Sequence, residues 1–210
     1  GPANKQGRIA ADHICGRRGA YTGALGTSVL KLFDLTAAST GLNEKQARAA
    51  GVAYDKVVTY STSHASYYPG ARNMTVKTLF DPASGRILGA QIVGFDGVDK
   101  RMDVLAAAIR AGLTAEQLTE LDLAYAPPYG SAKDPVNMAG YVIENVRAGL
   151  VEQHHWDAVA ELPADGSVIL LDVRTPGEVR KQGLLRSDAL HIPLDELRGR
   201  LGELDKGKKV

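Results

Sequence analysis

Hydrophobic and polar positions follow two different periods along the first 150 residues. Residues 5–18 and 98–113 carry apolar side chains three or four positions apart, a spacing that places them on one face of a helix. Runs rich in β-branched residues lie between these two segments and favour strands. We expect strands over 26–40, 56–63, 74–80 and 87–93, the last two joined by a hairpin loop with proline and glycine.

Three further helices are predicted from the residues that start them. Asn43 is a candidate N-cap, and Thr114 opens a capping-box pattern. Asp134, followed by proline, opens a segment of helical spacing that reaches to about Gly149. Strands grouped ahead of helices, with hairpin connections, predict an α+β domain over residues 20–150.

A second unit is predicted from Val151 to the end of the chain. Residues 167–174 are almost continuously apolar, which is typical of a strand in a parallel sheet covered on both faces. A helix, a short apolar stretch and another helix follow, as in the opening of a β-α-β pattern. Because half a parallel sheet has an unpaired edge, we expect residues 151–210 to be mobile unless neighbouring chains cover them.

Charge and composition exclude several classes of protein. The chain has 25 basic and 24 acidic residues, and its formal net charge of +1 provides no field for nucleic acid or for a membrane surface. No apolar run approaches the ~20 residues of a membrane span, and no secretory signal opens the chain. The single cysteine, Cys15, excludes an internal disulfide framework and fits a reducing cytoplasm.

The two ends of the chain have the character of cuts inside a larger protein. The first residue is not methionine, and a helix is predicted directly behind Gly1 and Pro2. The last residue, Val210, stands where a further strand would begin. We therefore expect the chain to be an internal fragment.

The chemistry of individual residues does not complete a catalytic set. No glycine-rich phosphate fingerprint stands between a strand and a helix, and the five histidines have no metal-ligand spacing. Cys15 has no redox partner in the sequence. Its place on the apolar side of a helix predicts a buried structural thiol.

Two proline-containing loops, residues 63–71 and 125–135, present tyrosines. A tyrosine in such a turn can be an aromatic plug with its hydroxyl in water. Alternatively, a phenol on a stiff loop can donate a hydrogen bond to a thiolate, a flavin or a developing anion. Lys133 is likewise either a solvated surface lysine or a partner for a phosphate. The residues alone leave these alternatives open.

Five segments of the chain resemble one enzyme family. They are GPANKQGRIAAD, GALGTSVLKLFDLTAASTGLNE, SYYPGA, GRILGAQIVGFDGVDKRMDVLAAAI and LAYAPPYGSAKDPVNMAGYVIEN. They are similar to the C-terminal portion of coenzyme A-disulfide reductases and of the related NADH oxidases and NAD(P)H-dependent persulfide reductases, which are FAD-dependent pyridine nucleotide-disulfide oxidoreductases. The stretch that begins with ILLDVRTPGEV is similar to the first half of a rhodanese domain.

The resemblance implies a domain organisation. Residues 1–19 would be the C-terminal end of an FAD-binding domain, and residues 20–150 a dimerisation domain made of an antiparallel sheet with flanking helices. Residues 151–210 would be a truncated α/β rhodanese-like domain. The protein would be a homodimer formed through residues 20–150, with loops that reach into the partner subunit's active site beside the flavin.

The resemblance also implies roles for single residues. Tyr67 and Tyr125 would present catalytic hydroxyls toward the thiol chemistry of coenzyme A, and Tyr125 would also face the flavin. The residues that bind coenzyme A would be Lys5, Tyr129 and Lys133. The remaining cofactor-binding residues would be Pro2, Ala3 and Asn4 at a flavin carbonyl oxygen, and Ser63 at the nicotinamide nucleotide.

The implied parent enzyme uses NAD(P)H and FAD to reduce coenzyme A disulfide, coenzyme A persulfide or polysulfide. The family's redox cysteine and nucleotide-binding motifs lie outside this chain, so the fragment itself is expected to be inactive. Three alternatives stay open. They are an NADH oxidase that reduces oxygen, a purely structural dimerisation module and, for the parent, a sulfurtransferase.

Overall fold

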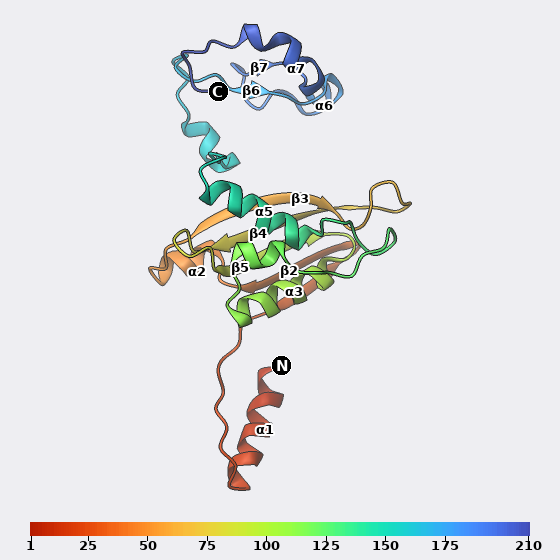
Figure 1. Ribbon diagram of the computed structural model, residues 1–210, viewed down its shortest axis with the longest axis vertical. Coiled ribbons are helices and arrows are strands. Elements are labelled where there is room, and N and C mark those ends of the chain that lie inside the picture. Colours follow the sequence, from red (N-terminus) through yellow and green to blue (C-terminus); the bar gives the residue numbers. More distant parts are fainter. The chain divides into compact units, whose positions relative to one another are not determined.

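An antiparallel sheet with the strand order β1-β2-β5-β4-β3 organises the first part of the chain (Figure 1). The computed structural model describes residues 1–210, which divide into two units, Gly1–Glu152 and Gln153–Val210. The division lies two residues beyond the end of the predicted dimerisation domain. The strands are β1 (Ser28–Leu32), β2 (Leu35–Gly41), β3 (Asp55–Thr62), β4 (Asn73–Phe80) and β5 (Ile87–Gly94).

Two long helices cover one face of this sheet. Helix α3 (Val98–Ala111) packs on β2 and β5, and helix α5 (Pro135–Arg147) packs on β3 (Figure 1). The short helix α4 (Ala115–Thr119) packs against α5. The predicted α+β architecture, with antiparallel strands and flanking helices, is confirmed for this unit. The largest fully buried apolar side chains of the core between sheet and helices are Met74, Phe80, Ile87, Ile92, Met102, Leu105, Leu118 and Ile143.

The helix starts that were predicted from capping residues are confirmed. Asn43 caps helix α2 (Glu44–Ala49), Thr114 caps α4, and Asp134 caps α5, each in a complete capping box. In each box a side-chain oxygen accepts a backbone N–H that the helix geometry leaves unpaired. These starts could be located because the signal is local to a few residues.

The prediction of one strand over residues 26–40 is wrong. This segment is a hairpin in which Leu32 of β1 pairs with Leu35 of β2, and Phe33 and Asp34 form the turn. Phe33 has φ 52°, a left-handed conformation that hairpin turns normally assign to glycine or asparagine. The turn therefore lacks the glycine or asparagine that usually marks such a hairpin, and Asp34 is its only polar residue.

The prediction of a buried Cys15 is also wrong. Helix α1 (Pro2–Ile14) buries none of its residues, and Cys15, which follows it, is exposed. The helical period was correct, although α1 begins three residues earlier and ends four residues earlier than expected. Periodicity shows which side of a helix is apolar, but it does not show whether another element covers that side.

A carboxylate at the sheet edge supports a prediction for acid stability. Glu44 contacts Lys56 of β3 and Lys77 of β4, and its side chain is 14% exposed. Burial disfavours its charge, but the hydrogen bonds from Lys77 and Lys56 outweigh this and lower its pKa from 4.5 to about 2. A lowered carboxyl pKa stabilises the fold above pH 4.5, and this contribution disappears as the pH falls toward 2.

Glu44→Gln is expected to reduce the free energy of unfolding by about 2 kcal/mol at pH 7. Urea unfolding at pH 7 and at pH 2.5 measures this difference for the variant and the wild type. The difference should be much smaller at pH 2.5, because this pH lies well below the ordinary pKa of 4.5 and close to the folded-state value of about 2. A difference of equal size at both pH values would contradict the electrostatic explanation.

The second unit contains a parallel pair of very short strands. Strand β6 (Leu171–Asp172) pairs in parallel with β7 (Leu190–His191), and helix α6 (Pro176–Gln182) lies between them in the sequence. The parallel pairing agrees with the prediction, but only two of the eight residues expected in the first strand belong to β6, and Val168 forms a separate parallel bridge with Lys209. The remaining elements are η1 (Trp156–Glu161), α7 (Leu194–Arg200) and η2 (Leu201–Glu203).

Candidate functional site

The two proline-containing loops lie together at one end of the sheet (Figure 1). The first loop, residues 63–72, joins β3 to β4, and the second, residues 120–134, joins α4 to α5. The hydroxyl oxygens of Tyr67 and Tyr125, 58 positions apart in the sequence, are 3.4 Å from each other. The fold therefore converts two separate tyrosines into a pair.

The tyrosine pair faces solvent and can act on a ligand. Tyr67 is 76% exposed and Tyr125 is 49% exposed. A separation of 3.4 Å is long for a bond between hydroxyls, so each group keeps capacity for another partner. The hydrogen bond with Tyr125 raises the pKa of Tyr67 above its ordinary value of 10.0. Tyr67 is thus a neutral hydrogen-bond donor near pH 7 and not a base there.

A buried arginine joins the two loops. Arg101, in the first turn of α3, is 1% exposed and pairs with Asp134, which is 3% exposed. Its Nη2 donates to Asp134 Oδ2 at 2.9 Å and to the carbonyl oxygen of Ser63 at 2.8 Å, and its Nη1 donates to the Gly97 carbonyl at 3.2 Å. The backbone N–H of Ala65 also donates to the Gly130 carbonyl at 2.9 Å.

Ser63 has a different environment from the other predicted site residues. It is 2% exposed, and its hydroxyl lies 3.1 Å from Nδ1 of His64 and accepts the backbone N–H of Arg72 at 3.2 Å. His64 Nε2 in turn lies 3.2 Å from the carbonyl oxygen of Pro69. These contacts close the first loop on itself. The Ser63 hydroxyl therefore holds the loop and has no free surface for a nucleotide within this chain.

Tyr129 and Lys133 extend the exposed surface beside Tyr125. Tyr129 is 71% exposed, and its carbonyl oxygen accepts a hydrogen bond from Lys100 Nζ at 3.4 Å. Lys133 Nζ lies 5.6 Å from the ring centroid of Tyr141, within the range of a cation–π contact. The second loop thus presents an aromatic ring and a cation within eight residues of Tyr125.

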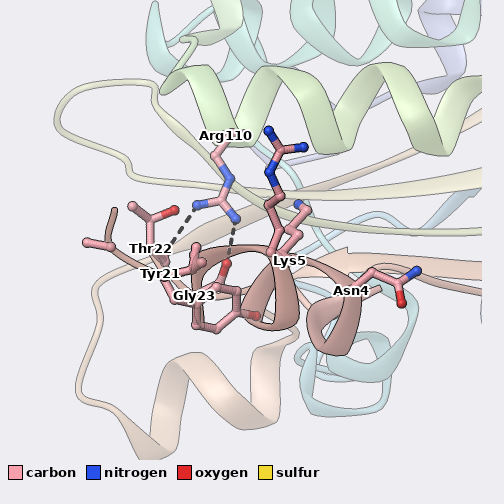
Figure 2. Close-up of a pocket in the computed structure, with 9 residues that line it drawn as sticks. Asn4, Lys5, Tyr21, Thr22, Gly23 and Arg110 are labelled. Atoms are coloured by element: carbon pink, nitrogen blue, oxygen red, sulfur yellow. Dashed lines mark hydrogen bonds between the residues drawn. The ribbon is translucent and has the colours of Figure 1, made fainter. Parts of the chain in front are cut away.

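A separate groove lies beside helix α1. It has a volume of about 630 Å³, and Figure 2 shows Arg110 directed toward the backbone of Thr22 and Gly23. Arg110 donates to the Gly23 carbonyl at 3.0 Å, which ties the segment after α1 to helix α3. The groove is lined by Asn4, Lys5, Arg8, Ile9, Ala20, Tyr21, Thr22, Gly23 and Arg110. Pro2 lines an adjacent hollow, and Ala3 is exposed in the first turn of α1.

The predicted site residues therefore form two groups. Lys5 and Asn4 lie at the groove with Arg110, in the last turn of α3. Tyr67 and Tyr125 lie on the loops that Arg101 holds, at the first turn of the same helix. Arg110 is nine positions after Arg101 in the helix, which corresponds to about 14 Å along the axis. The chain does not bring the two groups into one site.

Sequence reasoning missed Arg101, Lys100 and His64. Arg101 did carry a signal, because it stands between Val98 and Met102 on the apolar side of the predicted helix. A charged residue inside an apolar stripe is either buried with a partner or exposed by a distortion of the helix. No group of three or more His, Cys, Asp or Glu side chains is placed to hold a metal ion.

Comparison with known proteins identifies the domain that carries the tyrosine loops. Residues 27–135, which are more than half of the chain, match the model of the pyridine nucleotide-disulphide oxidoreductase dimerisation domain. The chain belongs to this family. The matched residues include both tyrosine loops, Arg101 and Asp134. None of the helices of this chain has both the length and the apolar character that crossing a bilayer requires.

Members of the pyridine nucleotide-disulphide oxidoreductase family that act on coenzyme A disulfide are similar to this chain. The coenzyme A disulfide reductase of Staphylococcus haemolyticus is 41% identical over 140 residues, which cover 66% of the chain and 31% of that protein. The enzyme of Staphylococcus aureus strain RF122 is 39% identical over 140 residues, with 66% of the chain and 32% of that protein covered. The chain thus spans about a third of the curated relatives it matches.

Solved structures extend the similarity to nearly the whole chain. Reduced Bacillus anthracis CoADR-RHD is 50% identical with a TM-score of 0.92, and the match covers 99% of this chain and 37% of that one. A NAD-dependent persulfide reductase from A. fulgidus is 42% identical with a TM-score of 0.85, over 98% of this chain and 36% of that one. The water-forming NADH oxidase of Lactobacillus brevis, at 23% identity and a TM-score of 0.61, covers 65% of this chain and 30% of that one and shares the fold.

Proposed function

We propose that this chain is the C-terminal portion of a flavoprotein that uses NAD(P)H and FAD to reduce coenzyme A disulfide, coenzyme A persulfide or polysulfide. The observation that carries the proposal is the Tyr67–Tyr125 pair, exposed on two loops held by buried polar contacts. Relatives at 39–50% identity are named as a coenzyme A disulfide reductase, CoADR-RHD and a persulfide reductase. The chain itself is inactive, because its only cysteine lies in neither tyrosine loop.

The two tyrosines act on the sulfur that leaves when a disulfide or persulfide bond is reduced. That sulfur departs as a thiolate, which is an anion. A neutral phenol can donate a hydrogen bond to a developing anion, and preorganised donors of this kind stabilise the transition state. With a pKa above 10, Tyr67 keeps its proton available for this hydrogen bond throughout the neutral range. Tyr129 and Lys133 bind coenzyme A by ring contact and by charge.

The start of helix α1 suits an oxygen atom of FAD. No side chain caps the helix, and its first turn contains no acidic residue, so the backbone N–H groups of Ala3 and Asn4 have no acceptor from a cap. A carbonyl oxygen of the flavin can accept them. When bound, FAD supplies the electrons for disulfide reduction. Pro2 fixes the first turn, and Lys5 faces the groove where it can meet coenzyme A.

A homodimer completes the active site. The tyrosine group and the α1 group lie at opposite ends of α3, so we assign the tyrosines to the partner subunit's site and Lys5 to the site of its own subunit. Residues 20–150 form the interface, and the matched family model is that of a dimerisation domain. Strand β1 is exposed along its whole length, although it contains Val29, Leu30 and Leu32. An apolar edge strand covered on neither face is a candidate interface.

Leu30→Asp together with Leu32→Asp is therefore expected to convert the chain from a dimer to a monomer. The two carboxylates would have to be desolvated to keep the interface. Sedimentation velocity at about 10 μM, where a Kd near 1 μM gives mostly dimer, measures the state of each variant. Lys31→Glu, on the same strand, is the control, and it should remain dimeric. A wild-type chain that is monomeric at this concentration would contradict the interface.

We propose that residues 151–210 belong to a rhodanese-like unit. The parallel β6–β7 pair with α6 between its strands has the β-α-β order of such a unit. A reductase that carries it would handle sulfane sulfur, which favours persulfide or polysulfide as substrate. A single cysteine and helices too short or polar to span a bilayer are compatible with a cytoplasmic protein.

The proposal is tested by NAD(P)H consumption in the full-length reductase. The enzyme is supplied in turn with coenzyme A disulfide, coenzyme A persulfide and oxygen, and the products are identified as thiol, sulfide, peroxide or water. Rapid turnover with a coenzyme A substrate supports the proposal. Turnover with oxygen alone would contradict the proposal and indicate an NADH oxidase. Turnover with none of the three would contradict it as well and favour a purely structural dimerisation module.

A further inference from the structure

We infer that Arg101 is the positioning residue of the tyrosine pair, and that it sets the distance between Tyr67 and Tyr125 by binding both of their loops. The inference rests on the proposed function for its catalytic consequence, but the positioning itself is independent of any reaction. Arg101 touches neither hydroxyl, since its partners are Ser63, Gly97 and Asp134. It acts through the backbone of one loop and the last residue of the other.

Arg101 contacts the first loop at Ser63, the residue that directly follows β3. Nη2 donates to the Ser63 carbonyl at 2.8 Å, the shortest of its hydrogen bonds. Ser63 is also where the loop closes on itself, since its hydroxyl binds the backbone N–H of Arg72. The guanidinium therefore holds the closed base of the loop, and Tyr67 stands four residues beyond it.

The contacts of the same side chain reach the second loop at its end. Asp134 accepts from Nε at 3.1 Å and from Nη2 at 2.9 Å, and its Oδ1 also caps α5 through the N–H of Val136. The carboxylate is thereby fixed to helix α5 and to Arg101 at once. Asn137, in the first turn of α5, donates to the carbonyl oxygens of Leu118 and Leu121 and fixes the residues before the loop. Tyr125 lies between these two anchors.

One further contact links the loops directly. The backbone hydrogen bond from Ala65 to Gly130 joins the middle of the first loop to the middle of the second. Both prolines of the second loop, Pro127 and Pro128, lack an N–H that could add another. Arg101 and this single backbone bond therefore account for the polar connections that bring the tyrosine loops together, apart from the long hydroxyl contact itself.

Lysine cannot replace arginine in this role. A guanidinium presents its N–H donors in a rigid planar fork, so it can serve a carboxylate on one side and carbonyl oxygens on the other. An ammonium is a compact point charge that can satisfy Asp134 but cannot reach the Ser63 and Gly97 carbonyls in the same geometry. Arg101→Lys therefore keeps the buried charge pair and releases the first loop.

The first test measures the tyrosine pair without any catalysis. The 210-residue chain is prepared with 3-fluorotyrosine at position 67, and its ¹⁹F resonance is recorded with tyrosine or phenylalanine at position 125. In the wild type, Tyr125→Phe should move the resonance, because the hydroxyl partner is lost. In Arg101→Lys with Tyr125 retained, the resonance should already lie close to the position that Tyr125→Phe produces in the wild type. Adding Tyr125→Phe to Arg101→Lys should then shift the resonance at least threefold less than it does in the wild type.

Two other variants separate positioning from general stability. Asp134→Asn retains an N-cap for α5 but loses the negative charge that pairs with Arg101, and it should behave like Arg101→Lys. Arg147→Lys is the matched control, because Arg147 likewise pairs with Glu116 and donates to the carbonyls of Pro82 and Ala83 at the other end of α5. It should leave the wild-type response intact. A full wild-type response to Tyr125→Phe in both Arg101→Lys and Asp134→Asn would overturn the inference.

The second test measures the consequence for the reaction in the full-length reductase. Arg101→Lys should lower kcat with a coenzyme A substrate about tenfold and change KM little, since it misplaces donors that act in the transition state. In a Tyr67→Phe background the same substitution should have no further effect on kcat. Independent, multiplicative losses would show that Arg101 does not act through Tyr67. If the fluorine response follows expectation while no coenzyme A turnover exists, the proposed function fails and the positioning role stands.

Discussion

Replacing both Tyr67 and Tyr125 by phenylalanine in the full-length reductase is expected to lower kcat with coenzyme A disulfide by about 100-fold. Phenylalanine keeps the ring and removes the hydroxyl, so the packing of the two loops changes little. The lost hydrogen bonds act on a thiolate that develops during the reaction, and KM should stay within about threefold. Steady-state NAD(P)H oxidation at saturating substrate measures both constants.

The single variants and a control sharpen this result. Because the two hydroxyls lie 3.4 Å apart and would act on the same leaving sulfur, each single Phe variant should show most of the loss of the double variant. Tyr60→Phe is the control, since Tyr60 on β3 is 77% exposed and contacts neither loop hydroxyl. It should keep wild-type turnover. A double variant that retains more than about a third of wild-type kcat would remove the tyrosines from the mechanism.

The pH dependence of the tyrosine contribution follows from the direction of its pKa shift. The hydrogen bond with Tyr125 raises the pKa of Tyr67, and a raised phenol pKa keeps the protonated donor present to higher pH. The ratio of wild-type to double-variant kcat should therefore stay constant from pH 6 to pH 9, below the ordinary value of 10.0. A ratio that collapses within this range would assign the effect to another group.

The fold was predictable wherever its signals were local. Three capping boxes, the proline at the start of α5 and the β-branched runs of β3, β4 and β5 each depend on a few adjacent residues. The turn at Phe33 was missed because its left-handed backbone is imposed by strand pairing and not by glycine or asparagine. Cys15 was misassigned because its exposure depends on what covers α1.

The candidate site was predictable only in part. Proline and tyrosine mark the two loops in the sequence, but the contact between Tyr67 and Tyr125 joins positions that only the sheet and α3 bring together. Arg101, which we infer to set that geometry, fits the pattern of an amphipathic helix in the sequence. Only the structure shows its partners. Ser63 shows the reverse case, since a polar residue at a loop base turned out to be 2% exposed.

The buried pair should also dominate the stability of this unit. Asp134→Ala leaves the Arg101 guanidinium, which is 1% exposed, without its carboxylate, and it removes the N-cap of α5. Breaking a buried pair by removing one partner costs about 3–5 kcal/mol, because the remaining charge is desolvated and uncompensated. Asp134→Asn keeps a capping side chain, so its loss should be smaller by about 1 kcal/mol.

Hydrogen exchange at the amides of β4 and β5 measures this loss, because central strands exchange only through global unfolding of their unit. Glu116→Ala is the matched control, since it removes the carboxylate partner of Arg147 but that carboxylate is 48% exposed. An exposed pair contributes about 0–1 kcal/mol, so its removal should be barely detectable. If Asp134→Ala and Glu116→Ala destabilise the unit equally, the burial of Arg101 has no energetic consequence and the loops must be held by other contacts.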